Sequence, residues 1–278
     1  MKDKICLITG GTSGVGYATA LGLARLGGTI EIVSRNEQSG NRAVEALKRK
    51  SGNNNVGFFC ANLSEPDSIR MLAEDFLTKY EYLHLLSNNA ALLPKTYQTN
   101  SKGYEITFAT SYLSHFLITN LLLEILKKSA PSRVITVSGN MGLVKHGKIY
   151  FNDIHLKQSF NPIKALLQAT LAKVTFSIEL AKRLDNSGVT SNTFHPGIVR
   201  SKLGRNLPFP INLLLNFGMN FIQETCRSAV FLASDEKAAK MNGIFYENGK
   251  AREFKSKYYT RESAQKLWEL STTLCNLN

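Results

Sequence analysis

The sequence contains few cysteines and no long apolar run. Its 278 residues include four cysteines, Cys6, Cys60, Cys226 and Cys275, which are far apart and form no Cys-x-x-Cys pair. This spacing argues against a disulfide framework and a metal site, and it favours a reducing compartment. No apolar stretch approaches the roughly 18 residues needed to span a bilayer. The N-terminus passes directly into a strand pattern, which leaves no room for a signal peptide. We therefore expect a cytoplasmic protein without a metal.

Acidic side chains are also scarce relative to basic ones. The chain has 34 Lys and Arg residues against 21 Asp and Glu residues, which gives a formal net charge of +13. A solvated basic surface is the simplest interpretation, and attraction to anionic lipid or to a phosphorylated ligand is the alternative. The basic residues are spread along the chain without a motif of a nucleic-acid module, so we expect no nucleic-acid partner.

No repeat, low-complexity tract or linker interrupts the chain, and strand patterns alternate with helical patterns throughout. We expect strands within residues 4–10, 29–36, 55–63, 83–91, 133–139, 188–197 and 243–248, and helices within 13–28, 39–50, 66–80, 104–129 and 163–185. Short buried strands that alternate with helices predict an α/β fold, a Rossmann-like doubly wound parallel sheet with helices on both faces. Residues 1–278 are predicted to form a single domain.

A glycine-rich loop with the sequence TGGTSGVG occupies residues 9–16, between the first expected strand and the first helix. Glycines there allow a tight turn and let a phosphate approach backbone N–H groups at the positive end of the helix. A tight turn that binds nothing is the alternative. The position of the loop favours a dinucleotide site.

Three motifs together resemble the short-chain dehydrogenase/reductase family: this loop, the NNAA at residues 88–91 and the HPG at residues 195–197. Residues 103–123, 171–184, 188–205 and 264–271 resemble its retinol dehydrogenase-like branch. The resemblance covers nearly the whole chain and implies a dinucleotide cofactor. The residues that it implies for cofactor binding are Gly10, Ser13, Gly14, Val15 and Gly16 at the pyrophosphate, Asn62, Leu63, Asn89 and Ala90 at the adenosine, and Pro196 and Gly197 beyond them.

Arg35 indicates which cofactor is expected. It follows the second strand, at the position where an acidic residue would bind the ribose 2′-hydroxyl of NAD. A guanidinium can instead pair with a 2′-phosphate, so NADP(H) is predicted, as a redox cofactor or in a purely structural role. An ordinary surface arginine, with the cofactor lost, is the alternative.

The catalytic set implied by the resemblance is missing. Family members use a tyrosine that supplies a proton, a lysine one helical turn later, a serine that polarises the carbonyl and an asparagine in the preceding long helix. The corresponding positions hold Leu166, Thr170, Gly139 and Ser111. A leucine can neither donate a proton nor stabilise an alkoxide, and loss of acid–base help typically lowers rates by about 10² to 10⁴-fold.

Other side chains are weaker candidates for proton transfer. Tyr97, His146 and Tyr150 come from segments expected to border the mouth of the site. Lys173 lies three residues after Thr170 and is expected to be a solvated helix lysine, with an orientation toward the cofactor as the alternative. The only Tyr-x-x-x-Lys, from Tyr246 to Lys250, contains Asn-Gly and is expected to be a turn after a strand.

Three functions therefore remain open. The first is an enzyme with non-standard chemistry on an apolar small molecule: cyclisation, isomerisation, or hydride transfer without a tyrosine acid. The second is a catalytically inert binding or regulatory subunit, and the third is a conventional NADPH-dependent carbonyl reductase with relocated groups. Residues 207–222 are predicted to form a substrate lid that could contact a membrane surface, and residues 250–278 a C-terminal extension. The two long helices, 104–129 and 163–185, are candidates for a homodimer interface.

Overall fold

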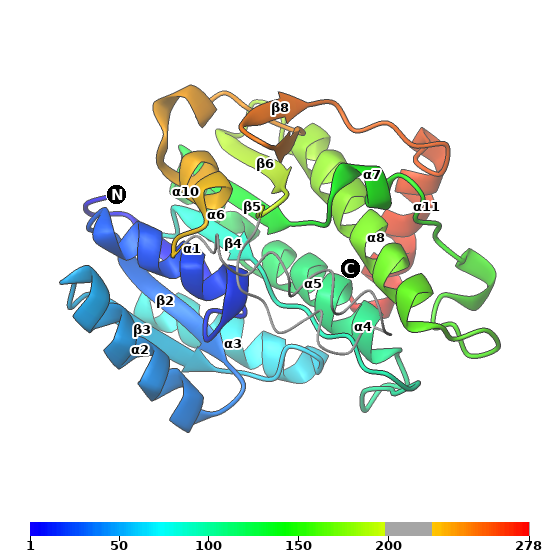
Figure 1. Ribbon diagram of the computed structural model, residues 1–278, viewed down its shortest axis with the longest axis horizontal. Coiled ribbons are helices and arrows are strands. Elements are labelled where there is room, and N and C mark those ends of the chain that lie inside the picture. The colour runs from blue at the N-terminus through cyan, green and yellow to red at the C-terminus, as the bar shows by residue number, and fades with distance from the viewer. Residues whose placement is uncertain (198–223, 278) are drawn as a thin grey trace.

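The computed structural model describes residues 1–197 and 224–277, and its centre is one eight-stranded sheet (Figure 1). The strands are β1 (Ile5–Ile8), β2 (Thr29–Ser34), β3 (Val56–Cys60), β4 (Leu85–Asn88), β5 (Ser132–Val137), β6 (Val189–Phe194), β7 (Phe245–Glu247) and β8 (Lys250–Arg252). Their order is β3-β2-β1-β4-β5-β6-β7-β8, and every neighbouring pair is parallel except β7 and β8. The predicted doubly wound parallel sheet is confirmed.

Helices cover both faces of this sheet. The helices are α1 (Gly14–Arg25), α2 (Glu37–Ser51), α3 (Pro66–Lys79), α4 (Ile106–Phe108), α5 (Ser114–Leu121), α6 (Leu123–Lys128), α7 (Met141–Val144), α8 (Pro162–Arg183), α10 (Arg227–Ser234) and α11 (Arg261–Leu274), with short 3₁₀ turns at Phe151–Asp153 and Glu236–Ala238. One hydrophobic core lies under α1, α2 and α10, and a second lies under α3, α5 and α8. Because parallel strands end at the same edge of a sheet, the loops after β1, β4, β5 and β6 lie together.

The long helix expected over residues 104–129 is divided into pieces. A π-helical segment, Ala109–Leu113, separates α4 from α5, and α5 ends before Leu122. Ser111 lies in this π-helical segment and is buried. Short π-helical insertions occur often at functional sites, and no periodicity in the sequence predicts this one.

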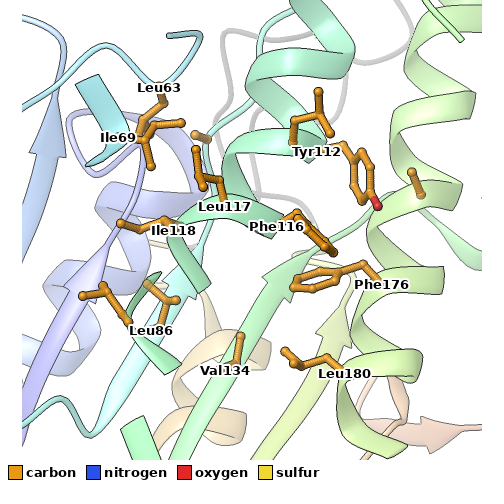
Figure 2. Close-up of a cluster of buried hydrophobic side chains, with 14 of the residues drawn as sticks. Leu63, Ile69, Leu86, Tyr112, Phe116, Leu117, Ile118, Val134, Phe176 and Leu180 are labelled. Carbon is orange, nitrogen blue, oxygen red and sulfur yellow. The ribbon is translucent and has the colours of Figure 1, made fainter. Parts of the chain in front are cut away.

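Aromatic side chains join α5 and α8 over the sheet (Figure 2). The ring centroids of Phe116 and Phe176 are 5.3 Å apart, and Tyr112 packs edge-on to Phe176. Each of these rings is at most 2% exposed. Burial of a whole aromatic side chain stabilises a core by about 1.5–3 kcal/mol, so this cluster fixes how α8 sits beside the ends of the strands.

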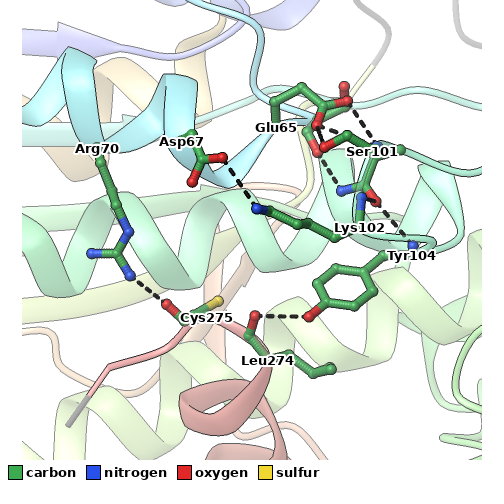
Figure 3. Close-up of polar contacts among 10 residues, drawn as sticks. Glu65, Asp67, Arg70, Ser101, Lys102, Tyr104, Leu274 and Cys275 are labelled. Carbon is green, nitrogen blue, oxygen red and sulfur yellow. Dashed lines mark hydrogen bonds and ion pairs between the residues drawn. The ribbon is translucent and has the colours of Figure 1, made fainter.

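The predicted C-terminal extension contains β8 and α11. A Thr260–Ser263 capping box begins α11, which packs against α8. Trp268 lies 5.0 Å from the Phe116 ring, and the Tyr112 hydroxyl is 2.6 Å from Ser271 Oγ. The end of the chain is held on α3, where Arg70 Nη2 donates to the Cys275 carbonyl at 2.6 Å (Figure 3). A homodimer through α5 and α8 would have to displace α11, and it stays a prediction.

Candidate functional site

The glycine-rich loop forms a close turn between β1 and α1. Gly10 and Gly14 have positive φ angles, 64° and 59°, which favour glycine. A Cβ atom on Gly16 would lie 2.4 Å from the Gly10 carbonyl oxygen, and one on Gly10 would lie 3.0 Å from the Ala90 Cα. The turn therefore requires glycine at these positions, as a backbone that approaches phosphate does.

The N-terminus of α1 is left without an internal cap. Ser13 has extended backbone angles at the N-cap, but its side chain makes no capping hydrogen bond, and the first turn contains no acidic residue. The first N–H groups of a helix need partners, and together with the helix dipole they favour an anion. Residues 13–16, which include Ser13 and Val15, therefore fit a pyrophosphate.

Thr9 connects this loop to the end of β4. Its hydroxyl oxygen accepts hydrogen bonds from the backbone N–H groups of Asn89, at 2.8 Å, and Ala90, at 3.2 Å. Asn89 Nδ2 donates to Ser87 Oγ at 2.9 Å, while Asn89 Oδ1 is buried without a partner among the described residues. The predicted positions Asn89 and Ala90 are thus held directly beside Gly10.

Arg35, Asn62 and Leu63 follow β2 and β3 at the same edge of the sheet. Arg35 is exposed and forms no hydrogen bond or ion pair with the described residues, so its guanidinium is free to take a phosphate. Asn62 Oδ1 accepts from Ser64 N and Ser64 Oγ, which leaves its amide nitrogen to face a ligand. Leu63 is 5% exposed and packs in the core, so only its backbone could contact a cofactor.

Pro196 and Gly197 follow β6, and Gly197 has a φ of 69°. The predicted substrate lid, residues 207–222, lies outside the described residues.

The positions of the missing catalytic set lie at the ends of β5 and α8 and on the π-helical segment. A Cβ atom on Gly139 would meet the Thr170 methyl group at 3.4 Å, so these two positions are in contact. Leu166 lies one helical turn before Thr170 on the same face of α8. The Thr170 hydroxyl donates to the Leu166 carbonyl at 2.6 Å, and Ser111 Oγ accepts from Leu92 N at 3.1 Å. Both hydroxyls are thus bonded to backbone, and none of the four side chains offers a free acid.

Tyr97, His146 and Tyr150 are the weaker candidates for proton transfer, expected to border the site. A surface groove of about 340 Å³ is lined by His146, Tyr150 and Lys164, among others. The Lys164 ammonium lies 4.0 Å from the centre of the Tyr150 ring. The Tyr97 hydroxyl is buried without a partner among the described residues, and burial, helped by nearby acidic groups, raises its pKa.

Lys173 differs most from its sequence-based expectation. Its side chain is 5% exposed, so the interpretation as a solvated helix lysine is wrong. Burial lowers its pKa from 10.5 to about 8. Beside it, burial and then the charge of Lys173 hold the pKa of His115 well below its ordinary value. Helical spacing could have predicted the side of α8 on which Lys173 lies, because Lys173 comes seven residues after Leu166 and therefore shares its face.

Comparison with known proteins agrees with this geometry. A family model described as short chain dehydrogenase matches residues 4–150, and the chain belongs to this family. Human retinol dehydrogenase 14 is 34% identical over 298 aligned residues, which cover 100% of this chain and 88% of the relative. Retinol dehydrogenase 12 of Bos taurus is 36% identical, with 99% and 87% covered. The predicted family and its retinol dehydrogenase-like branch are confirmed.

Solved structures share the fold. The crystal structure of an uncharacterised protein from Mycobacterium paratuberculosis superposes with a TM-score of 0.78 at 25% identity, covering 99% of this chain and 94% of that one. A complex of Pseudomonas aeruginosa RhlG with NADP gives a TM-score of 0.71 at 24% identity, covering 90% and 96%. These neighbours share the fold, and membership of the family supports the predicted NADP(H) cofactor.

The predicted cytoplasmic location is corrected by the same relatives. Retinol dehydrogenases of this kind are membrane-associated microsomal enzymes, so the cytoplasmic prediction is wrong. None of the described helices is both long enough and apolar enough to span a bilayer.

Proposed function

We propose that this chain is an NADP(H)-binding oxidoreductase that acts on an apolar small molecule without a tyrosine acid. The observation that carries the proposal is the contrast between two neighbouring parts of one site. The cradle formed by residues 9–16, Asn89 and Ala90 has the geometry of a dinucleotide site. The adjacent surface of Gly139, Leu166 and Thr170 presents only apolar groups and a hydroxyl that is already bonded.

Arg35 is the reason to prefer NADP(H) to NAD(H). It is an exposed cation without a partner among the described residues, at the end of β2 and beside β1 and the glycine-rich loop. A phosphate on the adenosine ribose would form charge-assisted hydrogen bonds with its guanidinium. When bound, the cofactor would supply a hydride. The protein would orient it through the α1 N-terminus and exclude water from its reactive face with Leu166.

The apolar surface restricts the substrates. Retinol, named in the relatives, is an apolar alcohol, and the Leu166 surface suits such a molecule. Since no tyrosine is present to protonate an alkoxide, an acceptor that is already cationic, such as an iminium, or a conjugated system fits better than a simple ketone. Cyclisation or isomerisation of an apolar substrate is compatible with the same surface.

Two other functions each have one supporting observation. The hydroxyls of Ser111 and Thr170 both bond to backbone, as expected for an inert binding subunit. The buried Lys173 beside His115 instead favours a reductase with relocated groups.

The first experiment measures cofactor affinity. NADPH and NADH are titrated by fluorescence against the wild-type protein, Arg35→Ala and Arg42→Ala. Arg42 is a matched exposed arginine on α2, whose guanidinium bonds to Gln38. We expect NADPH to bind more tightly than NADH, and Arg35→Ala alone to remove most of that preference. Absence of NADPH binding would refute the proposed redox function.

A further inference from the structure

A nearly buried lysine without a hydrogen-bond partner among the described residues lies on the same face of α8 as Leu166. Lys173 is 5% exposed and forms no hydrogen bond or ion pair with any residue that the structure describes. Lysine is almost never fully buried without a partner, because taking a charge out of water is strongly unfavourable. Its position therefore needs an explanation other than stability.

From helix geometry we expect the Lys173 side chain to extend toward the position of the missing lysine. Side chains of a helix point toward its N-terminus, so the Lys173 chain runs from its own turn toward Thr170. Three residues along a helix correspond to about 4.5 Å, a distance that four methylene groups can span. Thr170 is shorter than a lysine, so the Lys173 side chain has room to extend into this space.

His115 supplies a second polar group at the same depth. It lies on α5, four residues after Ser111, and its pKa responds to the charge of Lys173. His115 Nε2 is 3.0 Å from the carbonyl oxygen of Ala90, which it meets as a donor, while Nδ1 is buried without a partner among the described residues. Lys173 and His115 thus lie about one helical turn after Thr170 and Ser111, the positions of the missing lysine and asparagine.

The neighbouring strand ends add uncharged polar atoms. Asn88 and Thr136 pair across β4 and β5, and Asn88 Oδ1, Thr136 Oγ1 and Ser138 Oγ are all buried without partners among the described residues. Burial alone shifts the Lys173 pKa, and no described acidic group opposes it. On the facing helix α5, the charge of Lys173 helps to lower the pKa of His115. The three oxygens of Asn88, Thr136 and Ser138 can accept hydrogen bonds from an ammonium or from an intervening water.

We propose that Lys173 is the proton donor of this active site and that His115 positions it, in place of the tyrosine and lysine of the family. The proposal rests on the NADP(H)-binding part of the proposed function, and it extends the alternative of a reductase with relocated groups. NADPH, when bound, would supply the hydride that adds to the substrate carbon, and the C=O π electrons would move to oxygen. An O–H bond forms there as an N–H bond of Lys173 breaks, which leaves a neutral amine that solvent reprotonates. A conjugated or iminium acceptor needs this proton later or not at all.

The first test needs no cofactor. NMR of ¹³C,¹⁵N-lysine-labelled protein follows the Lys173 signal, assigned by its absence in Lys173→Met. We expect titration near pH 8 in the free protein, since burial lowers the pKa to about 8. Titration above pH 10 would overturn the proposal.

The second test separates catalysis from packing. Lys173→Met is compared with Lys182→Met, an exposed lysine on the same helix. We expect Lys173→Met to keep NADPH affinity within about twofold, to lose about 100-fold or more of turnover with decanal or retinal, and to melt at a higher temperature. Lys182→Met should change none of these, and His115→Phe should shift the pH profile of kcat. A Lys173→Met variant with wild-type turnover, or a wild-type protein that binds NADPH but reduces neither aldehyde, would refute this role. Failure to bind NADPH would refute the proposed function instead, and the NMR titration would still decide whether Lys173 can act as an acid.

Discussion

Replacement of Lys173 by methionine should stabilise the protein in a pH-dependent way. Burial lowers the lysine pKa from 10.5 to about 8, which corresponds to about 3 kcal/mol of destabilisation of the charged form in the folded state. Below pH 8 the lysine is protonated in both the folded and the unfolded state, so this destabilisation is fully present. Methionine fills a similar volume without a charge. At pH 7 we therefore expect the variant to be more stable by about 3 kcal/mol, or about 6 °C in Tm.

Between pH 8 and 10.5 the unfolded chain binds the lysine proton and the folded chain does not. Stability of the wild-type protein therefore rises with pH relative to the variant. By pH 9.5 the difference between the two should shrink by about 2 kcal/mol. Urea denaturation of both proteins at pH 7.0, 8.5 and 9.5 measures it, and other titrating groups cancel in the comparison. A difference that does not change with pH, or a variant less stable than the wild type at pH 7, would refute the argument that the ammonium is buried and unpaired.

Two further substitutions test the cradle and the C-terminal helix. Gly16→Ala should abolish NADPH binding, because its Cβ would lie 2.4 Å from the Gly10 carbonyl oxygen. Gly52→Ala is the control: its φ of 72° costs some stability, but its Cβ meets no atom within 4 Å, so it should bind NADPH normally. Fluorescence titration compares the two variants. Trp268→Ala should lower the free energy of unfolding by about 2–4 kcal/mol, since Trp268 lies 5.0 Å from the Phe116 ring and 4.2 Å from the Arg183 guanidinium, and urea denaturation measures the loss.

The sequence predicts the sheet and the cradle because both depend on local patterns. Short apolar strands that alternate with helices leave few topologies, and glycines between the first strand and helix restrict the loop. The turn predicted at Tyr246–Lys250 is also local: Asn248 and Gly249 have φ angles of 52° and 75° and connect β7 to β8, a strand that was not predicted.

Long-range packing explains what the sequence did not predict. The lysine pattern on α8 does not reveal that α11 packs on this helix, or that Lys173 is only 5% exposed. The π-helical segment around Ser111 lies between α4 and α5 and packs on α8, a long-range contact that residue propensity does not contain. Helical spacing places Lys173 on the face of Leu166, but its burial depends on the assembled core and could be found only in three dimensions.

Lys173 and the loss of the family lysine at position 170 are physically connected. A lysine at 170 would place a second ammonium about one turn from the first in a space with little water, where like charges repel strongly. The triple variant Leu166→Tyr, Thr170→Lys, Gly139→Ser should therefore gain only weak reductase activity, although Gly139→Ser itself fits, with contacts of 3.4 Å and 3.5 Å for its Cβ. Adding Lys173→Met removes the repulsion, and the restored tyrosine then supplies the proton, so the quadruple variant should exceed the triple one by at least about tenfold in kcat/KM. Equal activity of the two variants, at equal NADPH affinity, would mean that the two positions do not share one electrostatic environment.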